Sequence, residues 1–180
     1  MPFLRVAIKN AGQMRHFFKA TITTAIMILL FLSNMDLASA ATHAPQQGIV
    51  LRVSDGDTIR VRIGHDEEKV RLYEIDAPET KQSGGKEATD YLMQLLLTEN
   101  VTIYTQDIDQ YGRQVAIVVK SDGTIVQDEM LEAGLVWGYN KYCKVSRCKD
   151  WKRMEKQAQS KRIGLWTDGT AVPPWEWRKR

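Results

Sequence analysis

Five charged residues in the first two thirds of the chain are of types that act together on phosphate esters. They are Asp57, Arg71, Asp76, Glu79 and Arg113. Carboxylate oxygens select a hard cation such as calcium or magnesium, and an arginine fork matches a phosphodiester through paired hydrogen bonds. A glutamate beside a metal can take a proton from the attacking water or orient it. Together these residues indicate metal-assisted chemistry on a phosphodiester.

The two aspartates are expected to face each other across a hairpin. The segment 64–67 has the composition of a hairpin loop, and pairing about its centre sets Asp57 opposite Asp76, or within one residue of it. Two like charges about 5 Å apart are unfavourable unless a cation lies between them. The alternative is that Asp57 belongs to the Asp55-Gly56 turn and that Asp76 ends a strand before a proline.

The arginines are harder to place from spacing alone. Strict alternation along a strand sets Arg71 and Asp76 on opposite faces, so a bulge or bend before Pro78 is needed to bring them together. Arg113 ends a turn-like segment, 109–113, just before a further strand. The sequence therefore predicts a site near strand ends whose assembly depends on a local irregularity.

The elements that carry these residues read as five short strands with a helix after the third and more helix toward the end. Apolar residues alternate in each strand segment, and they recur at helical spacing in the other segments. This order predicts an α+β protein built on a small five-stranded OB-type β-barrel with about three α-helices. The expected strands are 49–54, 58–63, 70–75, 101–105 and 115–120, and the expected helices are 88–100, 125–134 and 146–162.

Residues 1–40 read as a cleavable export signal. A basic leader precedes a charge-free apolar run over 20–32, and Ala38-Ser39-Ala40 has the pattern of a cleavage site. The run is shorter than the about 20 residues that span a bilayer. We expect a periplasmic or extracellular protein without stable membrane association after cleavage; the alternative is an uncleaved membrane anchor.

The remaining chain divides into a polar arm at 41–47, one domain at 48–168 and a Trp-rich basic tail at 169–180. Its charge is segregated: residues 41–132 carry 9 basic and 17 acidic side chains, and residues 133–180 carry 12 and 4. The basic end favours polyanions. A solvated helix face with a basic tail explains the same charge, so charge does not choose between them.

Both cysteines lie close together in the exported part. Cys143 and Cys148 are expected to form a local disulfide in an oxidising compartment. Two thiolates alone do not make a zinc site, and no histidine lies near them in sequence.

Three segments in register resemble the signature segments of the staphylococcal (micrococcal) nuclease family. They are Ser54-Asp55-Gly56-Asp57-Thr58, the stretch from Val70-Arg71-Leu72 to Ile75-Asp76-Ala77-Pro78-Glu79-Thr80, and Asp109 to Arg113. The resemblance covers about residues 48–166 and continues in Glu132-Ala133-Gly134-Leu135 and Gly164-Leu165-Trp166. It implies an OB-type thermonuclease that hydrolyses DNA and RNA with calcium and leaves 3'-phosphate ends.

The resemblance also implies a role for each residue of the site. Asp57 and Asp76 would bind Ca2+ together with the backbone carbonyl of Ala77. The other roles are phosphate binding by Arg71 and Arg113, action on water by Glu79, and a nucleotide pocket lined by Tyr111 and, through an ungapped match, Tyr142. The type member of the family has threonine at the position of Ala77. This chain also lacks the type member's lysine-rich loop between 80 and 91, which leaves substrate grip and terminal preference open.

Two other functions compete with a calcium nuclease. An OB barrel can hold single strands on aromatic and basic residues without cutting them, but a module that only binds would be expected to have lost some of the five charged residues. A histidine-dependent or zinc nuclease needs a pair of ligands or an acid and a base, and His16, His43 and His65 supply no such pair. We expect a monomer that takes DNA and RNA as substrates.

Overall fold

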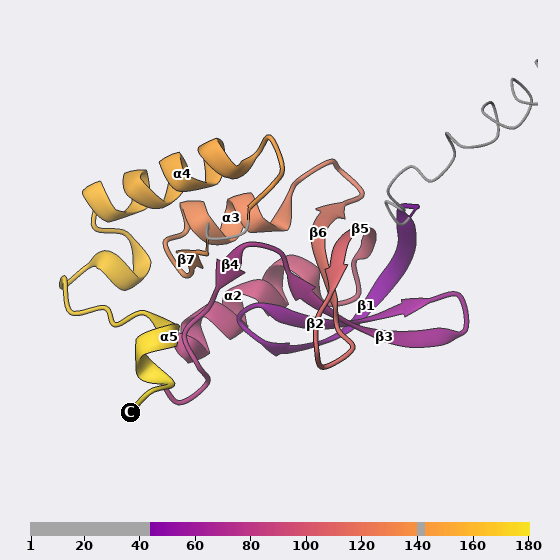
Figure 1. The fold of residues 1–180 in the computed structure, drawn as a ribbon, viewed down its shortest axis with the longest axis horizontal. Helices are drawn as coiled ribbons and strands as arrows, with labels where there is room; N and C mark the ends of the chain where they lie inside the picture. Colours follow the sequence, from indigo (N-terminus) through magenta and orange to yellow (C-terminus); the bar gives the residue numbers. More distant parts are fainter. Residues whose placement is uncertain (1–43, 140–142) are drawn as a thin grey trace, which may run out of the picture. The chain divides into compact units, whose positions relative to one another are not determined.

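Five strands close into a barrel in the order β1-β2-β3-β6-β5, as the sequence predicted. The structure is a computed structural model, and it describes residues 44–139 and 143–180 (Figure 1). The predicted signal at 1–40 lies outside the described residues. Within the described ranges no helix is long and apolar enough to cross a membrane. The barrel strands are β1 Gln46–Asp55, β2 Thr58–Ile63, β3 Asp66–Leu72, β5 Asn100–Ile108 and β6 Gln114–Lys120.

In the part of the chain that the structure describes, three helices of seven or more residues accompany the barrel. In Figure 1, α3 and α4 lie side by side, and α2 runs between them and the barrel. A two-stranded sheet of β4 and β7 stands apart from the barrel strands. The remaining elements are α2 Gly85–Leu96, α3 Val126–Glu132, α4 Cys148–Ser160, β4 Ile75–Asp76, β7 Trp137–Gly138, the 3-10 turn η1 Gly164–Trp166 and the short helix α5 Pro174–Trp177. The confirmed α+β class thus comes with shorter helices than expected.

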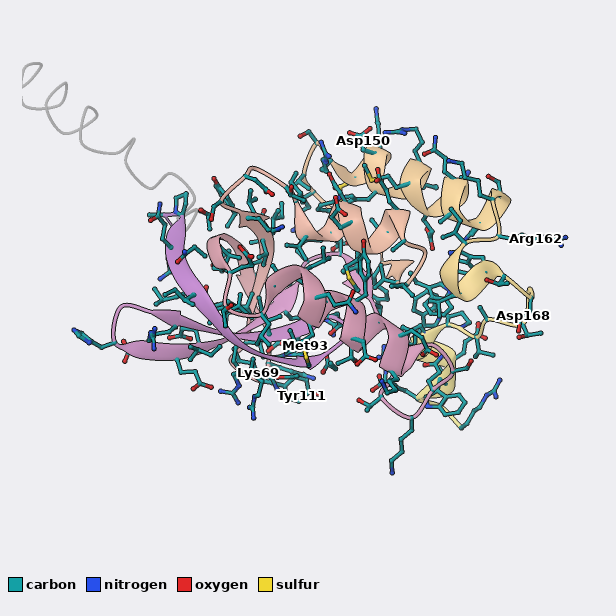
Figure 2. All side chains as sticks on the ribbon, turned by 180° about the vertical axis from the view of Figure 1, so that it is seen from behind. Lys69, Met93, Tyr111, Asp150, Arg162 and Asp168 are labelled. Carbon is teal, nitrogen blue, oxygen red and sulfur yellow. A yellow bond between two sulfur atoms is a disulfide. The ribbon has the colours of Figure 1, made fainter. Side chains whose placement is uncertain are left out.

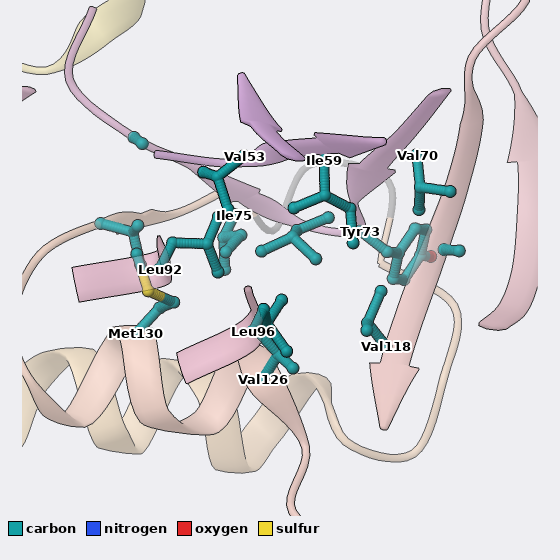
Figure 3. Close-up of a cluster of buried hydrophobic side chains, with 14 of the residues drawn as sticks. Val53, Ile59, Val70, Tyr73, Ile75, Leu92, Leu96, Val118, Val126 and Met130 are labelled. Atoms are coloured by element: carbon teal, nitrogen blue, oxygen red, sulfur yellow. The ribbon is translucent and has the colours of Figure 1, made fainter. Parts of the chain in front are cut away.

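The core forms where the barrel meets α2 and α3 (Figure 3). Ile59 of β2, Leu92 and Leu96 of α2, and Val126 and Met130 of α3 are completely shielded from solvent. Alternation along the strands and i, i+4 spacing along the helices place these side chains on one face of each element. Burying each such side chain contributes about 1.5–3 kcal/mol, so the barrel is held rigidly against its helices.

The β2–β3 hairpin is tighter than the sequence suggested. Ile63 pairs with Asp66, which leaves only Gly64 and His65 in the turn rather than the four residues 64–67. Gly64 has a φ of 60°, a conformation that glycine adopts without steric cost. The shorter turn shifts every pair along the hairpin.

This shift makes the expected register wrong. Thr58 pairs with Arg71, and the backbone oxygen of Asp57 accepts a hydrogen bond of 2.8 Å from the N–H of Leu72. Asp57 therefore lies across from Leu72 and not from Asp76. Another feature of the chain must bring the two aspartates together.

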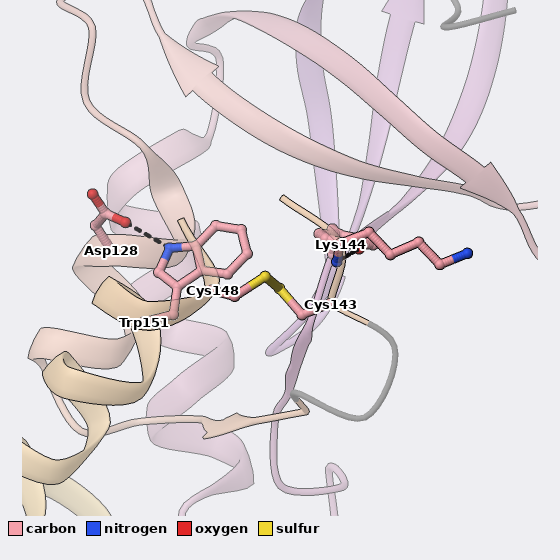
Figure 4. The surroundings of a disulfide bond; sticks show 6 residues. Asp128, Cys143, Lys144, Cys148 and Trp151 are labelled. Atoms are coloured by element: carbon pink, nitrogen blue, oxygen red, sulfur yellow. Dashed lines mark hydrogen bonds between the residues drawn. A yellow bond between two sulfur atoms is a disulfide. The ribbon is translucent and has the colours of Figure 1, made fainter. Parts of the chain in front are cut away.

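The predicted disulfide between Cys143 and Cys148 is present. Cys148 is the first residue of α4, and Trp151, one turn later, donates its indole N–H to Asp128 of α3 at 2.7 Å (Figure 4). The backbone N–H of Lys144, inside the disulfide loop, donates to the hydroxyl of Tyr73 at 3.2 Å. The bridge thus ties the start of α4 to the chain beside the barrel.

Replacing Gly85 by alanine is expected to destabilise the protein by about 1–3 kcal/mol, as overpacking does. A Cβ on Gly85 would meet the backbone oxygen of Glu79 at 2.0 Å, so the chain around Glu79 must shift. Urea unfolding measures the loss. Lys86→Ala is the control, because its partner Asp90 is an exposed i, i+4 neighbour and such pairs contribute under about 0.5 kcal/mol. Equal stability of Gly85→Ala and the wild type would contradict the close approach of Gly85 to the backbone oxygen of Glu79.

Removing the disulfide in the Cys143→Ser, Cys148→Ser variant is expected to cost about 2 kcal/mol, because the bridge closes only a short loop. The melting temperature should fall by about 5 °C, measured by circular dichroism. Reductant should lower the melting temperature of the wild type by the same amount and leave the double variant unchanged. If reductant also lowered the melting temperature of the double variant, the loss of the disulfide would not be the cause of the fall.

Candidate active site

One arginine joins the two predicted cation ligands. The guanidinium of Arg71, near the end of β3, donates at 2.8 Å to Asp57 Oδ1 and at 2.8 Å to Asp76 Oδ1. Asp57 is 5% exposed and Asp76 is 1% exposed, whereas the Arg71 side chain keeps 23% of its surface. Buried charges of this kind are found only with paired, hydrogen-bonded partners. The three side chains form one hydrogen-bonded unit, in which only the Arg71 side chain keeps substantial contact with solvent.

A bend at Glu74 makes this unit possible. β3 ends at Leu72, and Glu74 has a φ of 57°, which is uncommon for a residue with a side chain. After the bend, β4 leaves the barrel and pairs with β7, with Asp76 opposite Trp137. Strict alternation no longer applies between Arg71 and Asp76. The bend that the sequence analysis required is thus present, four residues before Pro78.

Asp57 is held firmly by its surroundings. Its Oδ2 accepts the backbone N–H of Ala77 at 3.0 Å, and its Oδ1 also accepts the hydroxyl of Thr58 at 2.9 Å. Burial raises the pKa of Asp57 to about 6, although the Arg71 guanidinium acts in the opposite direction. Such a carboxyl group gains from a further positive charge beside it.

Arg113 is positioned by a different carboxylate. Its Nε donates to Asp109 Oδ2 at 2.6 Å, and its backbone N–H donates to Asp109 Oδ1 at 3.0 Å. Burial would raise the pKa of Asp109, but these bonds and the N–H of Tyr111 outweigh it and lower the pKa. The Arg113 guanidinium lies 5.5 Å from the centre of the Tyr111 ring, which is 74% exposed (Figure 2). The turn therefore presents an arginine and an open aromatic face together.

Glu79 sits in a loop that its neighbours hold in place. Its backbone N–H donates to Gln82 Oε1 at 3.1 Å, and its backbone oxygen accepts from the N–H of Gln82 at 2.7 Å. The Glu79 side chain remains 42% exposed. Glu79 is thus a solvent-accessible carboxylate on a fixed backbone, three residues after the buried Asp76.

A second arginine, from the far end of the chain, reaches the same carboxylates. Arg178 donates to Asp76 Oδ2 at 2.7 Å, to Asp76 Oδ1 at 3.3 Å and to Glu79 Oε1 at 2.7 Å. Its hydrogen bond to Asp76 is the largest of the effects that raise the pKa of Arg178. Arg178 lies in the segment predicted as a Trp-rich basic tail at 169–180, and no sequence pattern indicated this contact.

All five predicted charged residues line one cavity of about 900 Å3. Tyr111 and Ala77 line it as well, together with Arg178, Glu74 and Tyr139. Tyr142, predicted for the nucleotide pocket, lies outside the described residues. Tyr139, which the sequence analysis did not select, forms a tilted ring pair with Trp175 at 5.8 Å. The cavity therefore combines carboxylates, arginines and aromatic rings from segments far apart in sequence.

The cavity wall also carries a carboxylate, Glu74, that pairs with no positive group among residues 44–139 and 143–180. Glu74 is 8% exposed, and its Oε2 has no hydrogen-bond partner. Burial raises the pKa of Glu74 to about 7. The backbone oxygen of Glu74 accepts the N–H of Tyr139 at 2.8 Å, which fixes the strained bend.

The donors in this cavity are compatible with a hard cation. No group of three or more His, Cys, Asp or Glu side chains in the described ranges converges on one point. The two buried carboxylates are instead held together by Arg71, so the protein supplies few ligands, all of them oxygen. Calcium takes six to eight oxygen ligands and readily includes water and backbone carbonyls. A cavity of about 900 Å3 leaves room for those waters.

Comparison with known proteins decides the family. Residues 69–168 match the family described as staphylococcal nuclease homologue, which is more than half of the chain. The chain belongs to the staphylococcal nuclease family.

Several relatives of this nuclease cover most of its length. An uncharacterized endonuclease of Escherichia coli O157:H7 is 36% identical over 155 residues, which is 86% of this chain and 97% of the relative. The micrococcal nuclease of Shigella flexneri is 33% identical over 151 residues, 79% of this chain and 86% of the relative. The staphylococcal-like nuclease CAN1 of Arabidopsis thaliana is 41% identical over 113 residues, 62% of this chain and 33% of the relative.

Family and fold agree. The closed five-stranded barrel with its helices matches the family, and the protein is a thermonuclease-like hydrolase that acts on nucleic acids. The matched segment contains the arginine pair of the nuclease and Asp76, but it ends before Arg178. The contact from the C-terminal tail is thus a feature of this chain outside the matched region.

The two arginines of the nuclease are expected to differ in their effect on stability. In chelator, Arg71→Ala should cost about 3 kcal/mol, because it leaves two buried carboxylates without their shared partner. Arg113→Ala should cost about 1 kcal/mol or less, because Asp109 stays near solvent and keeps backbone donors. Urea unfolding of both variants measures the difference.

A divalent cation should restore part of the stability lost in Arg71→Ala and none of that lost in Arg113→Ala. Equal losses in the two variants, or no cation effect on Arg71→Ala, would contradict the assignment of Arg71 as the link between the aspartates.

Proposed function

We propose that this protein is a calcium-dependent phosphodiesterase that hydrolyses DNA and RNA with little sequence specificity and leaves 3'-phosphate ends. The observation that carries the proposal is the hydrogen-bonded unit of Asp57, Arg71 and Asp76, which opens into the same cavity as Glu79 and Arg113. Carboxylates for a cation, arginines for a phosphate and a carboxylate for water thus line the same cavity.

Asp57, Asp76 and the backbone carbonyl of Ala77 would hold the cation. Bound calcium would offset the charge that builds on the phosphate oxygens in the transition state. The two carboxylates are kept in place without it by Arg71 and by the N–H of Ala77. The protein therefore presents its ligands already oriented.

Arg71 and Arg113 bind the scissile phosphate from two sides. Arg71 presents a partly exposed edge to the cavity, and Arg113 is oriented by its Nε bond to Asp109. Arginine donors that are fixed before the substrate binds stabilise charge on the phosphoryl oxygens without reorganising. Truncation of Arg113 should accordingly lower turnover far more than stability.

Glu79 accepts a proton from the attacking water. Its side chain is exposed enough for water to reach it, while the loop around Gln82 holds its backbone. In-line attack at phosphorus then breaks the bond to the 5'-oxygen, and the 3'-oxygen keeps the phosphate. This assignment requires Glu79 to be free of Arg178 during the reaction.

Recognition of the backbone explains tolerance of both sugars. Arginine contacts to phosphate carry no sequence information. The open ring of Tyr111 offers a stacking surface that suits any base, and Tyr142 is proposed to extend this pocket. DNA and RNA strands are therefore both expected as substrates.

The protein is proposed to act outside the cytoplasm as a monomer. Support comes from the apolar leader and its cleavage pattern within residues 1–40 and from the disulfide in the folded part. The division into a signal at 1–40, an arm at 41–47, a domain at 48–168 and a tail at 169–180 is part of this proposal. β1 begins at Gln46, so the arm contributes its last two residues to the barrel.

Digestion of circular single-stranded DNA tests the proposal. The purified protein should cut the circle with calcium and leave it intact in excess chelator, and Glu79→Gln should lower the rate about 10²–10⁴-fold, as loss of a general base does. Gel electrophoresis follows the circle, which has no ends and therefore reports internal attack only. End-labelling of the products identifies the phosphate position.

Glu99→Gln is the matched control, because Glu99 is an exposed glutamate that does not line the cavity. It should cut like the wild type. Full cutting in chelator would contradict the role of calcium. Strand binding without any cutting would instead favour a binding module.

A further inference from the structure

The last residues of the chain are anchored beside the cavity by contacts of their own. The side-chain amide of Gln82 donates to the backbone oxygen of Val172, Pro174 is buried, and Trp175 packs against Tyr139. In Figure 1, α5 lies against the loop that connects β4 to α2. Because these contacts are independent of Arg178, the tail delivers its arginine to a fixed place.

Arg178 occupies the atoms that a cation needs. It bonds to both oxygens of Asp76 and to one oxygen of Glu79, and Asp76 Oδ1 already accepts a bond from Arg71. A metal ion must approach the same oxygen lone pairs. The guanidinium and the ion are therefore alternatives at Asp76.

The electrostatics of Asp76 also favour release of Arg178 when a cation binds. Asp76 has a side-chain exposure of 2%, so its interaction with a neighbouring positive group is weakly screened. A divalent ion placed on Asp76 would stand within a few ångströms of the Arg178 charge and repel it. Arg178 keeps 45% of its side-chain surface and has solvent to move into, whereas Arg71 is held by two carboxylates and also donates to the backbone oxygen of Ile75.

We propose that Arg178 is a residue of the active site that competes with the divalent cation for Asp76. In the cation-free protein it pairs with Asp76 and Glu79. When a cation binds to Asp76, Arg178 releases both carboxylates, and Glu79 becomes free to act on water. The inference rests on the proposed function, because it takes Asp76 as a cation ligand. It makes the cation affinity of the nuclease a property of its C-terminal tail.

Calorimetric titration of the chelator-treated full chain with calcium chloride tests this competition. Arg178→Gln should bind calcium about tenfold more tightly than the wild type, because its neutral side chain no longer pairs with a buried carboxylate. Lys179→Gln removes the same charge one residue later. Among the described residues the Lys179 side chain has no carboxylate partner. The calcium affinity of Lys179→Gln should therefore equal that of the wild type.

Tryptophan fluorescence gives a second readout that needs no substrate. Trp175 and Trp177 lie in α5, directly before Arg178, so release of the arginine by calcium should change the emission of the wild type. The change should be absent in Arg178→Gln and reduced in Trp175→Phe. A change of equal size in wild type and Arg178→Gln would show that tail movement is not tied to this contact.

Weaker or unchanged calcium binding by Arg178→Gln would overturn the inference, since Arg178 would then support the ligands or play no part. Absence of calcium binding in both proteins would overturn it together with the calcium dependence. Calcium-dependent cutting with equal affinities would reject the competition alone. Tighter binding by Arg178→Gln without any cutting would reject the proposed nuclease and keep the competition.

Discussion

The site depends on one ionic interaction, the guanidinium of Arg71 between Asp57 and Asp76. Two buried carboxylates cannot stay side by side without a positive partner, because burial disfavours the charged form of each. Arg71 supplies that partner from within the barrel, and it does so with both ends of its fork. The bend at Glu74, the loop at Glu79 and the tail are arranged around this unit. Its geometry is therefore set by the fold before any ligand arrives.

The barrel acts as the frame that holds this unit, and the segments outside it add the parts that can move. Asp57 and Arg71 belong to a tight hairpin with a fully buried inner face. Asp76 lies in the two-stranded sheet of β4 and β7, Glu79 lies in a loop held by Gln82, and Arg178 lies in a tail held by a hydrogen bond to Gln82 and a ring contact. Such a site combines arginines that are fixed for phosphate binding with two carboxylates, Asp76 and Glu79, that can exchange Arg178 for another partner.

Much of this arrangement could be predicted from the sequence, and the remainder has physical reasons. Alternation and helical spacing are local signals, so the strands, the helices and the disulfide between Cys143 and Cys148 were found. Asp57 lies opposite Leu72 rather than Asp76, and the turn accounts for part of this difference, because it uses two residues, Gly64 and His65, where the composition suggested four. The bend at Glu74 has no glycine or proline to mark it. Arg178 meets Glu79 across 99 residues of chain, and no local pattern records such a contact.

The parallel pairing of β3 with β6 has a consequence for when the protein becomes active. Arg71 pairs with Val115, and Val70 pairs with Gln114, the residue after Arg113. The seam that closes the barrel therefore also sets the distance between the two arginines. Contacts of such long sequence separation form late, because the loop between them must first be ordered. A short hairpin brings Asp57 next to Arg71, whereas Arg113 joins them only through this long-range pairing, so the complete site requires a closed barrel.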